Sequence, residues 1–393
     1  MKFLKFIAAA VFALAMVACG DEPTNTPVEK SPFRMEVSSN FVQIGVDHAY
    51  FLVYLDEELV DPAELTFYDE NDEEVEMTTL EIEIDGQTVT VPEWAPTEPT
   101  TKSFWVSYKT YFTKELITIT AVDFAFPDSM EDPQPDNVSF KKRTFFTQFT
   151  GAGCGYCPWA KAALYEAAAD EAYADKFVVA AIYTYDGQTS KLYPTENGDI
   201  STAFGVSSYP TVIYDMIGSF SYERVDKDYV SVKAAIDNTQ QQEAKAGIAV
   251  NVASDEGDTF VARVSVKAAV DGEYNVGAWL VEDGIKEKQA NNGCGYPMDF
   301  DNHNNVLRYA DSGKEYIGHS LGAMKAGEIK DHVFTMNFFK GTYNKDGKEV
   351  KAPWVKENCR LIVFVTTSVR GSAYVTNVVA NDIYSESIAF DYK

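Results

Sequence analysis

Basic residues are scarce in this chain: 33 lysines and arginines stand against 60 aspartates and glutamates in 393 residues. The formal net charge is therefore −27 at pH 7. A protein of this charge repels phosphate groups, which excludes nucleic-acid binding and adsorption to anionic lipid as its functions. We expect the excess negative charge to keep the chain soluble outside the cytoplasm.

Histidine is also rare, and the four histidines, at positions 48, 303, 319 and 332, show neither metal-ligand nor catalytic-triad spacing. The sequence contains no phosphate-binding glycine loop, no nucleophile elbow and no dinucleotide-binding fingerprint. Two polar stretches, 69–76 and 299–305, contain possible cation ligands, but the first lacks EF-hand spacing and both are typical of solvated turns. We therefore expect no metal site and no cofactor.

Long hydrophobic runs are missing as well. The apolar run Phe6–Ala18 follows Lys2 and Lys5, and it is shorter than the roughly 20 residues that span a bilayer, so residues 1–18 are predicted to be a secretory signal. The run ends in Met-Val-Ala before Cys19, which resembles the lipobox of bacterial lipoproteins and implies lipidation of Cys19. An ordinary cleaved signal beside a free cysteine is the alternative.

Residues 19–32 contain three prolines and are predicted to be a tether. Asp21 and Glu22 look like the export tag that takes some Bacteroidetes lipoproteins to the cell surface, although acidic residues also suit a solvated linker. We therefore expect an outer-membrane lipoprotein that faces either the periplasm or the cell exterior.

Beyond the tether the pattern predicts a multidomain protein. Residues 33–126 alternate short apolar runs with turns, which is typical of an immunoglobulin-like β-sandwich. The proline-rich and acidic stretch 127–139 predicts a linker. In 140–245, strands predicted at 144–150, 177–183 and 211–214 alternate with helix patterns, which indicates an α/β domain. Residues 246–393 return to alternation and are predicted to form a second β-sandwich.

The α/β domain contains the one motif with clear chemistry, Cys154-Gly155-Tyr156-Cys157-Pro158. It lies between the predicted strand 144–150 and the predicted helix 157–174. Backbone N–H groups at a helix start stabilise a thiolate, and the spacing allows Cys157 to resolve a mixed disulfide on Cys154. A disulfide that only staples the turn is an alternative, and a zinc site would need two further ligands.

This region resembles the thioredoxin-like fold, on the evidence of residues 148–158 and the later sequence Tyr209-Pro210-Thr211. The resemblance implies a cis-proline at position 210 beside the two cysteines, with Tyr209 and Pro210 presenting a backbone edge to a substrate. Gly155 and Tyr156 are similar to the dipeptide of periplasmic disulfide isomerases. One departure is Gln148, which occupies the position of a buried acid in thioredoxins and cannot accept a proton.

The chain as a whole resembles the Outer-membrane-protein-twenty-eight family of Bacteroidetes lipoproteins. The resemblance rests on Phe149-Thr150-Gly151 before the cysteine motif and on residues 303–308, His-Asn-Asn-Val-Leu-Arg. It implies an acylated outer-membrane protein with a thioredoxin-like middle and a β-rich C-terminal part. Adhesion or receptor roles have been suggested for the family, so the resemblance bears on fold and location more than on activity.

Cys294 and Cys359 are the remaining cysteines. In an oxidising envelope they are expected to form a structural disulfide, while Cys294 as a regulatory partner of Cys154 is the alternative.

Two functions follow from these predictions. The first is a lipid-anchored thiol–disulfide oxidoreductase that acts through Cys154 and Cys157 on the disulfides or dithiols of envelope proteins. The second is a non-catalytic surface protein whose β domains bind an extracellular ligand or partner.

Overall fold

The computed structural model describes residues 32–84, 86–113, 116–194, 199–221, 230–254, 259–313, 315–337, 342–352, 354–369, 371–383 and 387–393. The predicted signal, Cys19 and the tether up to residue 31 lie outside the described residues. The chain divides into two compact units, Met1–Phe126 and Pro127–Lys393. Among the described residues, no helix has the length and apolar character needed to cross a membrane.

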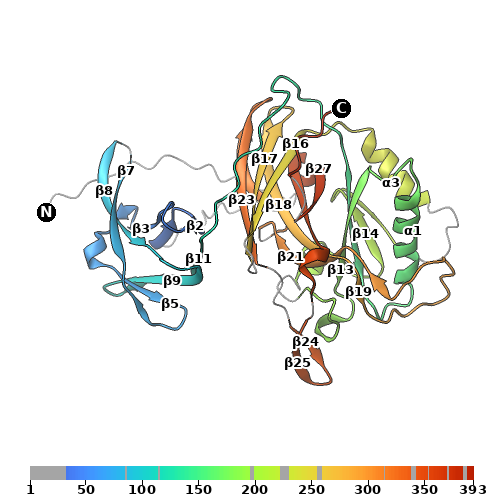
Figure 1. Cartoon of the computed structure of the whole chain (residues 1–393), viewed down its shortest axis with the longest axis horizontal. Helices are drawn as coiled ribbons and strands as arrows, with labels where there is room; N and C mark the ends of the chain where they lie inside the picture. The colour runs from blue at the N-terminus through green and yellow to red at the C-terminus, as the bar shows by residue number, and fades with distance from the viewer. Residues whose placement is uncertain are drawn as a thin grey trace, which may run out of the picture. The chain divides into compact units, whose positions relative to one another are not determined.

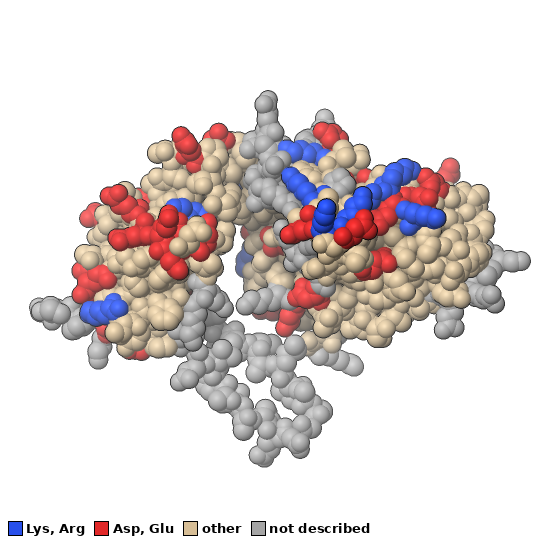
Figure 2. Space-filling model, turned by 90° about the horizontal axis from the view of Figure 1, so that it is seen from below, with Lys and Arg blue, Asp and Glu red and all other residues tan. Residues whose placement is uncertain are grey.

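The first unit consists of two β-sheets on a shared core (Figure 1). Its strands are β1 (Phe33–Val37), β2 (Phe41–Gln43), β3 (Ala49–Leu55), β4 (Glu58–Leu59), β5 (Thr66–Asp69), β6 (Glu74–Val75), β7 (Thr78–Ile84), β8 (Gln87–Trp94), β9 (Thr100–Tyr108), β10 (Tyr111–Phe112) and β11 (Ile117–Val122). One sheet has the order β1-β3-β8-β7 and the other β2-β11-β9-β5-β6. Alternate residues of β3 face the core, where Phe51 packs against Phe67 and Phe104 of the opposite sheet. Acidic side chains predominate on the face of this unit seen in Figure 2.

The second unit begins with the alternation of strands and helices that the sequence predicts. Its elements up to residue 240 are β12 (Thr144–Thr150), α1 (Cys157–Ala169), β13 (Phe177–Tyr183), α2 (Ile200–Ala203), β14 (Thr211–Tyr214), β15 (Gly218–Phe220) and α3 (Val230–Gln240). Strand β12 lies between β13 and β14, and all seven of its residues are buried because Phe145 and Phe149 pack into one apolar cluster and Phe146 into another. Helix α1 ends earlier than predicted, since the Asp170 backbone is extended and its carboxylate accepts hydrogen bonds from Ala172 N and Lys233 Nζ.

The rest of the second unit is almost entirely β-structure. Its strands are β16 (Ala246–Ser254), β17 (Thr259–Ala268), β18 (Gly272–Glu282), β19 (Ile285–Lys286), β20 (Asn302–His303), β21 (Val306–Asp311), β22 (His319–Met324), β23 (Ile329–Asn337), β24 (Thr342–Lys345), β25 (Lys348–Lys351), β26 (Cys359–Val369) and β27 (Ser372–Asp382). The small sheet β16-β17-β23 packs on β18, β26 and β27 through an apolar core.

One continuous sheet runs through the second unit, in the order β15-β14-β12-β13-β21-β18-β26-β27 with β22 beside β18. The two halves of this sheet meet where Ala181 of β13 pairs in parallel with Val306 of β21. Strands on both sides of the boundary predicted at residue 246 therefore share one sheet. Helices α1 and α3 lie together on one face (Figure 1), packed through Ala163 and Ile236.

The stretch predicted as a linker, residues 127–139, packs against the second unit instead of running free. The ammonium group of Lys267 is fully buried, and a buried cation needs acceptors. The stretch 127–139 supplies these acceptors: Lys267 Nζ lies 2.7 Å from an Asp132 carboxylate oxygen and 2.7 Å from the Pro135 carbonyl oxygen. Arg263 Nε also donates to the Pro127 carbonyl at 2.7 Å.

Candidate functional site

Cys154 and Cys157 form a disulfide in the turn between β12 and α1, with their Cα atoms 5.4 Å apart. Helix α1 begins at Cys157, whose N–H donates to the Cys154 carbonyl at 3.2 Å, and Pro158 occupies the first turn. Cys154 therefore lies just before the start of α1, in agreement with the predicted position between the strand 144–150 and the helix 157–174.

Both cysteines are buried. Cys154 is 4 % exposed and Cys157 is 1 % exposed, whereas Tyr156 between them is 46 % exposed. The expectation that Cys154 is open to another protein is not met in this arrangement, because backbone segments cover the turn from two sides.

The loop after β13 forms one of these sides. The Gly153 N–H lies 3.0 Å from both carboxylate oxygens of Asp186, which fixes the turn before Cys154. A Cβ atom on Gly153 would come within 2.2 Å of Asp186 Oδ1. Only glycine permits this close approach, so Asp186 and Gly153 act as a pair in shaping the turn.

The Tyr209–Pro210 turn lies at the end of the neighbouring strand. Thr211 pairs with Phe149, so the register of β14 against β12 brings this turn to the end of β12 from which the cysteine motif continues. The peptide bond is cis, as the resemblance implied. Tyr209 Oη lies 3.0 Å from Thr184 Oγ1, and its ring meets Tyr185 edge-on at 5.4 Å. Pro210 is buried.

A segment of the C-terminal β region forms the second side. Ala290 N donates to the Ala152 carbonyl at 2.7 Å and Asn292 N donates to the Gly155 carbonyl at 2.8 Å. The Asn292 side chain lies directly over Gly155, where an added Cβ atom would approach it to 2.4 Å. The sequence offered no signal for this contact, because it joins residues far apart in the chain.

The side-chain amide of Gln289 reinforces this contact. Its Nε2 atom lies 3.0 Å, 2.9 Å and 3.1 Å from the carbonyl oxygens of residues 151, 152 and 154. The two amide hydrogens can satisfy two of these acceptors at a time. Gln289 is itself buried, so the amide is held among the carbonyls of the cysteine turn.

Beneath the sheet end, Gln148 lines a cavity of about 100 Å³ together with Lys161 and Tyr183. Burial lowers the pKa of Lys161 to about 8. Gln148 is buried and non-ionisable, so Lys161 is the basic group at this cavity. We overlooked Lys161 in the sequence, although its position four residues after Cys157 places both on one side of α1.

His303 is a buried neutral histidine. Its Nδ1 accepts from the Tyr183 hydroxyl at 2.8 Å and its Nε2 donates to the Glu287 carbonyl at 2.9 Å. These two hydrogen bonds need a proton on Nε2 only. A second proton, on Nδ1, would have no acceptor. Burial lowers the pKa of His303 to about 4, and the ring serves as a structural link below the segment at 289–292.

This histidine makes stability depend on pH. The unfolded ring takes up a proton below its ordinary pKa of 6.5, whereas the folded ring resists protonation down to about 4, so stability is complete above 6.5 and is lost as pH falls between these values. The expected loss is about 3 kcal/mol of unfolding free energy. Urea unfolding of the second unit at several pH values tests this: His303→Gln should show a shallower slope, and His48→Gln, in the first unit, should not. Equal slopes for His303→Gln and the wild type would contradict the assignment.

The predicted disulfide between Cys294 and Cys359 is wrong, because both are free buried thiols. The backbone N–H of Cys294 donates to Asn291 Oδ1 at 2.7 Å in the loop beside the cysteine turn. Cys359 begins β26 inside the core of the sandwich, and its thiol donates to the Val355 carbonyl at 3.4 Å. Burial raises the pKa of Cys294, and it raises that of Cys359 to about 12. Neither thiol is activated for exchange.

Residues 303–308, which carried the family resemblance, lie where the two halves of the long sheet meet. Asn305 has a φ of 58°, and its carbonyl accepts the Ala181 N–H of β13 at 2.7 Å. Arg308 is fully buried, with Nε 2.8 Å from Glu282 Oε2 and Nη1 2.9 Å from the Lys191 carbonyl. These residues hold the β-rich half against the α/β half and so keep Gln289 beside Cys154.

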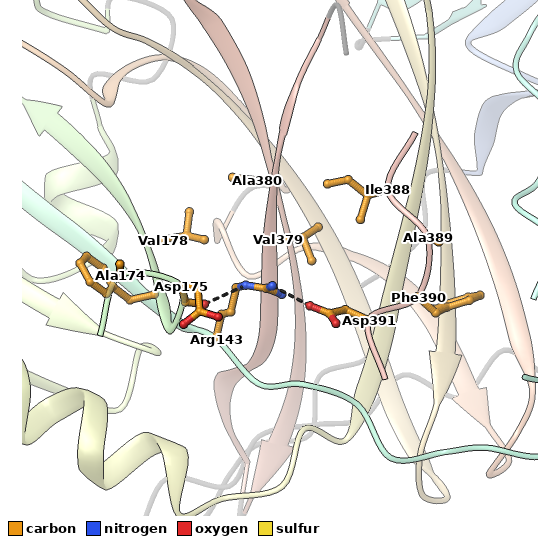
Figure 3. Close-up of a pocket in the computed structure, with 11 residues that line it drawn as sticks. Arg143, Ala174, Asp175, Val178, Val379, Ala380, Ile388, Ala389, Phe390 and Asp391 are labelled. Carbon is orange, nitrogen blue, oxygen red and sulfur yellow. Dashed lines mark hydrogen bonds and ion pairs between the residues drawn. The ribbon is translucent and has the colours of Figure 1, made fainter. Parts of the chain in front are cut away.

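A larger cavity, of about 490 Å³, lies elsewhere in the second unit (Figure 3). Apolar side chains from β13, β27 and the C-terminal segment line it, among them Val178, Val379 and Phe390. Arg143 crosses it, with Nη2 2.6 Å from an Asp391 carboxylate oxygen and Nε donating to the Asp175 carbonyl at 3.1 Å. Arg143 is paired with Asp391, and the Asp175 carboxylate is paired with Lys141, so each charged group of the lining already has a partner.

A family model matches part of the α/β half and most of the β-rich half of the second unit. Residues 197–386 match the family model of Outer membrane protein Omp28. The Omp28 match confirms the predicted outer-membrane location, while the face of the membrane stays a prediction. Cys154 and Cys157 lie outside the matched residues, so the Omp28 match bears on location and not on redox chemistry.

Several solved structures resemble the chain. HBP35 of Porphyromonas gingivalis is 18% identical, with a TM-score of 0.48 over 63% of this chain and 77% of that one. A domain of the outer membrane lipoprotein Omp28 from the same organism is 20% identical, with a TM-score of 0.23 over 36% and 88%. A DUF4785 family protein from Legionella pneumophila is 9% identical, with a TM-score of 0.20 over 89% and 57%. No curated protein matches the chain.

Proposed function

We propose that the protein is a lipid-anchored outer-membrane lipoprotein whose second unit is a thiol–disulfide oxidoreductase with a thioredoxin-like arrangement of β12, α1, β13, β14 and α3. The observation that carries the proposal is the disulfide between Cys154 and Cys157, at the turn from a buried strand into a helix, with the Tyr209–Pro210 turn at the end of the adjacent strand. The two sheets that share one core support an immunoglobulin-like fold for the first unit, and Cys19 would carry the lipid.

The chemistry is an exchange of two electrons with a protein dithiol. A substrate thiolate attacks the sulfur of Cys154, the Cys154–Cys157 bond breaks, and Cys157 leaves as a thiolate. The second substrate thiolate then attacks its own partner sulfur and releases Cys154, so the substrate is oxidised and the pair is reduced. In the reverse direction the reduced pair cleaves a substrate disulfide. Gly155, Tyr156 and the Tyr209–Pro210 turn would contact the substrate chain.

Cys157→Ser provides the test of this mechanism. Because the variant can attack a disulfide through Cys154 but cannot resolve the product, we expect it to accumulate a mixed disulfide with insulin. Non-reducing gels and peptide mass spectrometry on the reduced, detergent-solubilised full chain would detect the adduct and locate it. Cys154→Ser keeps the same number of thiols and is the matched control. Equal adduct formation by both variants, or none by either, would contradict the proposal.

A further inference from the structure

The connection between β19 and β20, residues 287–301, is called the strap here. Its ends are held together, because Ile285 pairs with His303 and Lys286 pairs with Asn302. The ladder continues into the strap, where Glu287 N donates to the Asp301 carbonyl at 3.0 Å. The strap is thus a long loop whose two ends are joined by the pairing of β19 with β20. Its middle can shift while these paired ends stay in place.

The first part of the strap lies on the cysteine turn in the manner of an added strand. Residues 290 and 292, which alternate along the segment, donate their N–H groups to the carbonyls of residues 152 and 155. An extended polypeptide that joins an exposed backbone edge makes contacts of this kind. The bonds are to backbone atoms, so another extended chain could form them equally well.

The second part of the strap follows α1 away from the disulfide. Tyr296 donates its hydroxyl hydrogen to Glu166, and its ring meets that of Tyr165 at 6.1 Å. Lys161 Nζ donates to the carbonyls of Phe300 and Asn302, each at 2.8 Å. These contacts anchor the far part independently of the segment over Cys154.

Residues 289–292, which lie over the disulfide, can be displaced from the cysteine turn. Asn291, Asn292 and Gly293 are exposed on the outer side, and the contacts to the turn come from backbone amides and the Gln289 amide. These three exposed residues contribute no large apolar side chain to the contact with the turn. The carbonyls of Ala152 and Gly155 would then be free to pair with an incoming chain.

We propose that the strap is a built-in inhibitor, in which residues 289–292 occupy the edge that binds an extended substrate polypeptide and must be displaced before that polypeptide reaches Cys154. This inference rests on the proposed oxidoreductase function and adds its mode of substrate binding and its regulation. The backbone edge at residues 151–155 is the docking site, and the partner is an extended chain that contains a disulfide or dithiol.

The test compares access to Cys154 for a large and a small reagent. The reduced full chain is labelled with a maleimide carrying a 5-kDa polyethylene glycol or with iodoacetamide, and peptide mass spectrometry isolates the signal of Cys154. Gln289→Ala removes the amide that bridges the turn, and Asn292→Gly removes the side chain over Gly155. Lys288→Ala changes an exposed residue of the same strap and is the matched control.

We expect Gln289→Ala to raise the ratio of large-reagent to small-reagent labelling roughly tenfold, as the loss of one to two net hydrogen bonds implies. Asn292→Gly should raise the ratio in the same direction, and Lys288→Ala should leave it at the wild-type value. Wild-type ratios in both Gln289→Ala and Asn292→Gly would overturn the strap proposal. The labelling ratio does not depend on catalytic turnover. A failed strap proposal can therefore be told apart from a failed oxidoreductase proposal, which the adduct assay with Cys157→Ser tests.

Discussion

Replacement of Cys154 by serine is expected to lower insulin reduction to the rate of dithiothreitol alone. A serine hydroxyl cannot form a disulfide, so the first exchange step is lost completely. The remaining thiols cannot replace it, because Cys157 is only 1 % exposed and because Cys294 and Cys359 are buried with a raised pKa. The measurement is the turbidity of insulin chains released by the full-length protein, with Cys294→Ser as a control that should keep the wild-type rate.

The same assay decides between the two functions that the sequence leaves open. A wild-type rate in Cys154→Ser would contradict the proposed mechanism. If the wild type itself does not exceed the reductant alone, the disulfide is structural, and a surface protein whose β-sheets bind an extracellular ligand is the surviving function. The paired charges of the cavity at Arg143 identify no such ligand.

The elements of the second unit that were predicted without error are those whose pattern is local. The predicted strands 144–150, 177–183 and 211–214 agree with β12, β13 and β14. Each is a short apolar or β-branched run bounded by turn residues, because both faces of the central sheet are covered. The cysteine turn itself could be placed for the same reason, since it lies between a strand and a helix with strong local patterns.

The parts that escaped prediction depend on contacts between distant residues. Strand β21 was missed, although it joins the two halves of the long sheet through a single pair, Ala181 and Val306. The proline-rich stretch 127–139 has the composition of a linker, yet the buried Lys267 holds it in place. Composition and periodicity describe a segment by itself, whereas both of these features are set by partners more than a hundred residues away.

The candidate site shows the same limit. The residue types at positions 154 and 157 fix the chemistry that is available, but Gln289 and Asn292 determine whether another protein reaches it. The mistaken disulfide between Cys294 and Cys359 came from pairing the leftover cysteines, an argument that contains no distance. Reactivity follows from the sequence motif, and access follows from the tertiary fold.

Arg308→Met is expected to destabilise the second unit by about 3–5 kcal/mol, because it removes the cation from a buried ion pair and leaves an uncompensated carboxylate. Arg308 and Glu282 are both buried, with 2.8 Å between Arg308 Nε and Glu282 Oε2. The change also removes the donor to the Lys191 carbonyl. Urea unfolding followed by near-ultraviolet circular dichroism measures the loss.

The double variant Arg308→Met with Glu282→Leu separates the ion pair from simple packing. Replacing both charges by apolar groups of similar size removes the unpaired carboxylate, so most of the lost stability should return. The exposed pair Lys325 and Asp271, 2.8 Å apart on the surface, is the control, and Lys325→Met should leave the unfolding free energy close to the wild-type value because solvent screens this pair. An Arg308→Met variant as stable as Lys325→Met would show that the junction between β21 and β18 does not depend on this pair, and the strap beside Cys154 would then need another support.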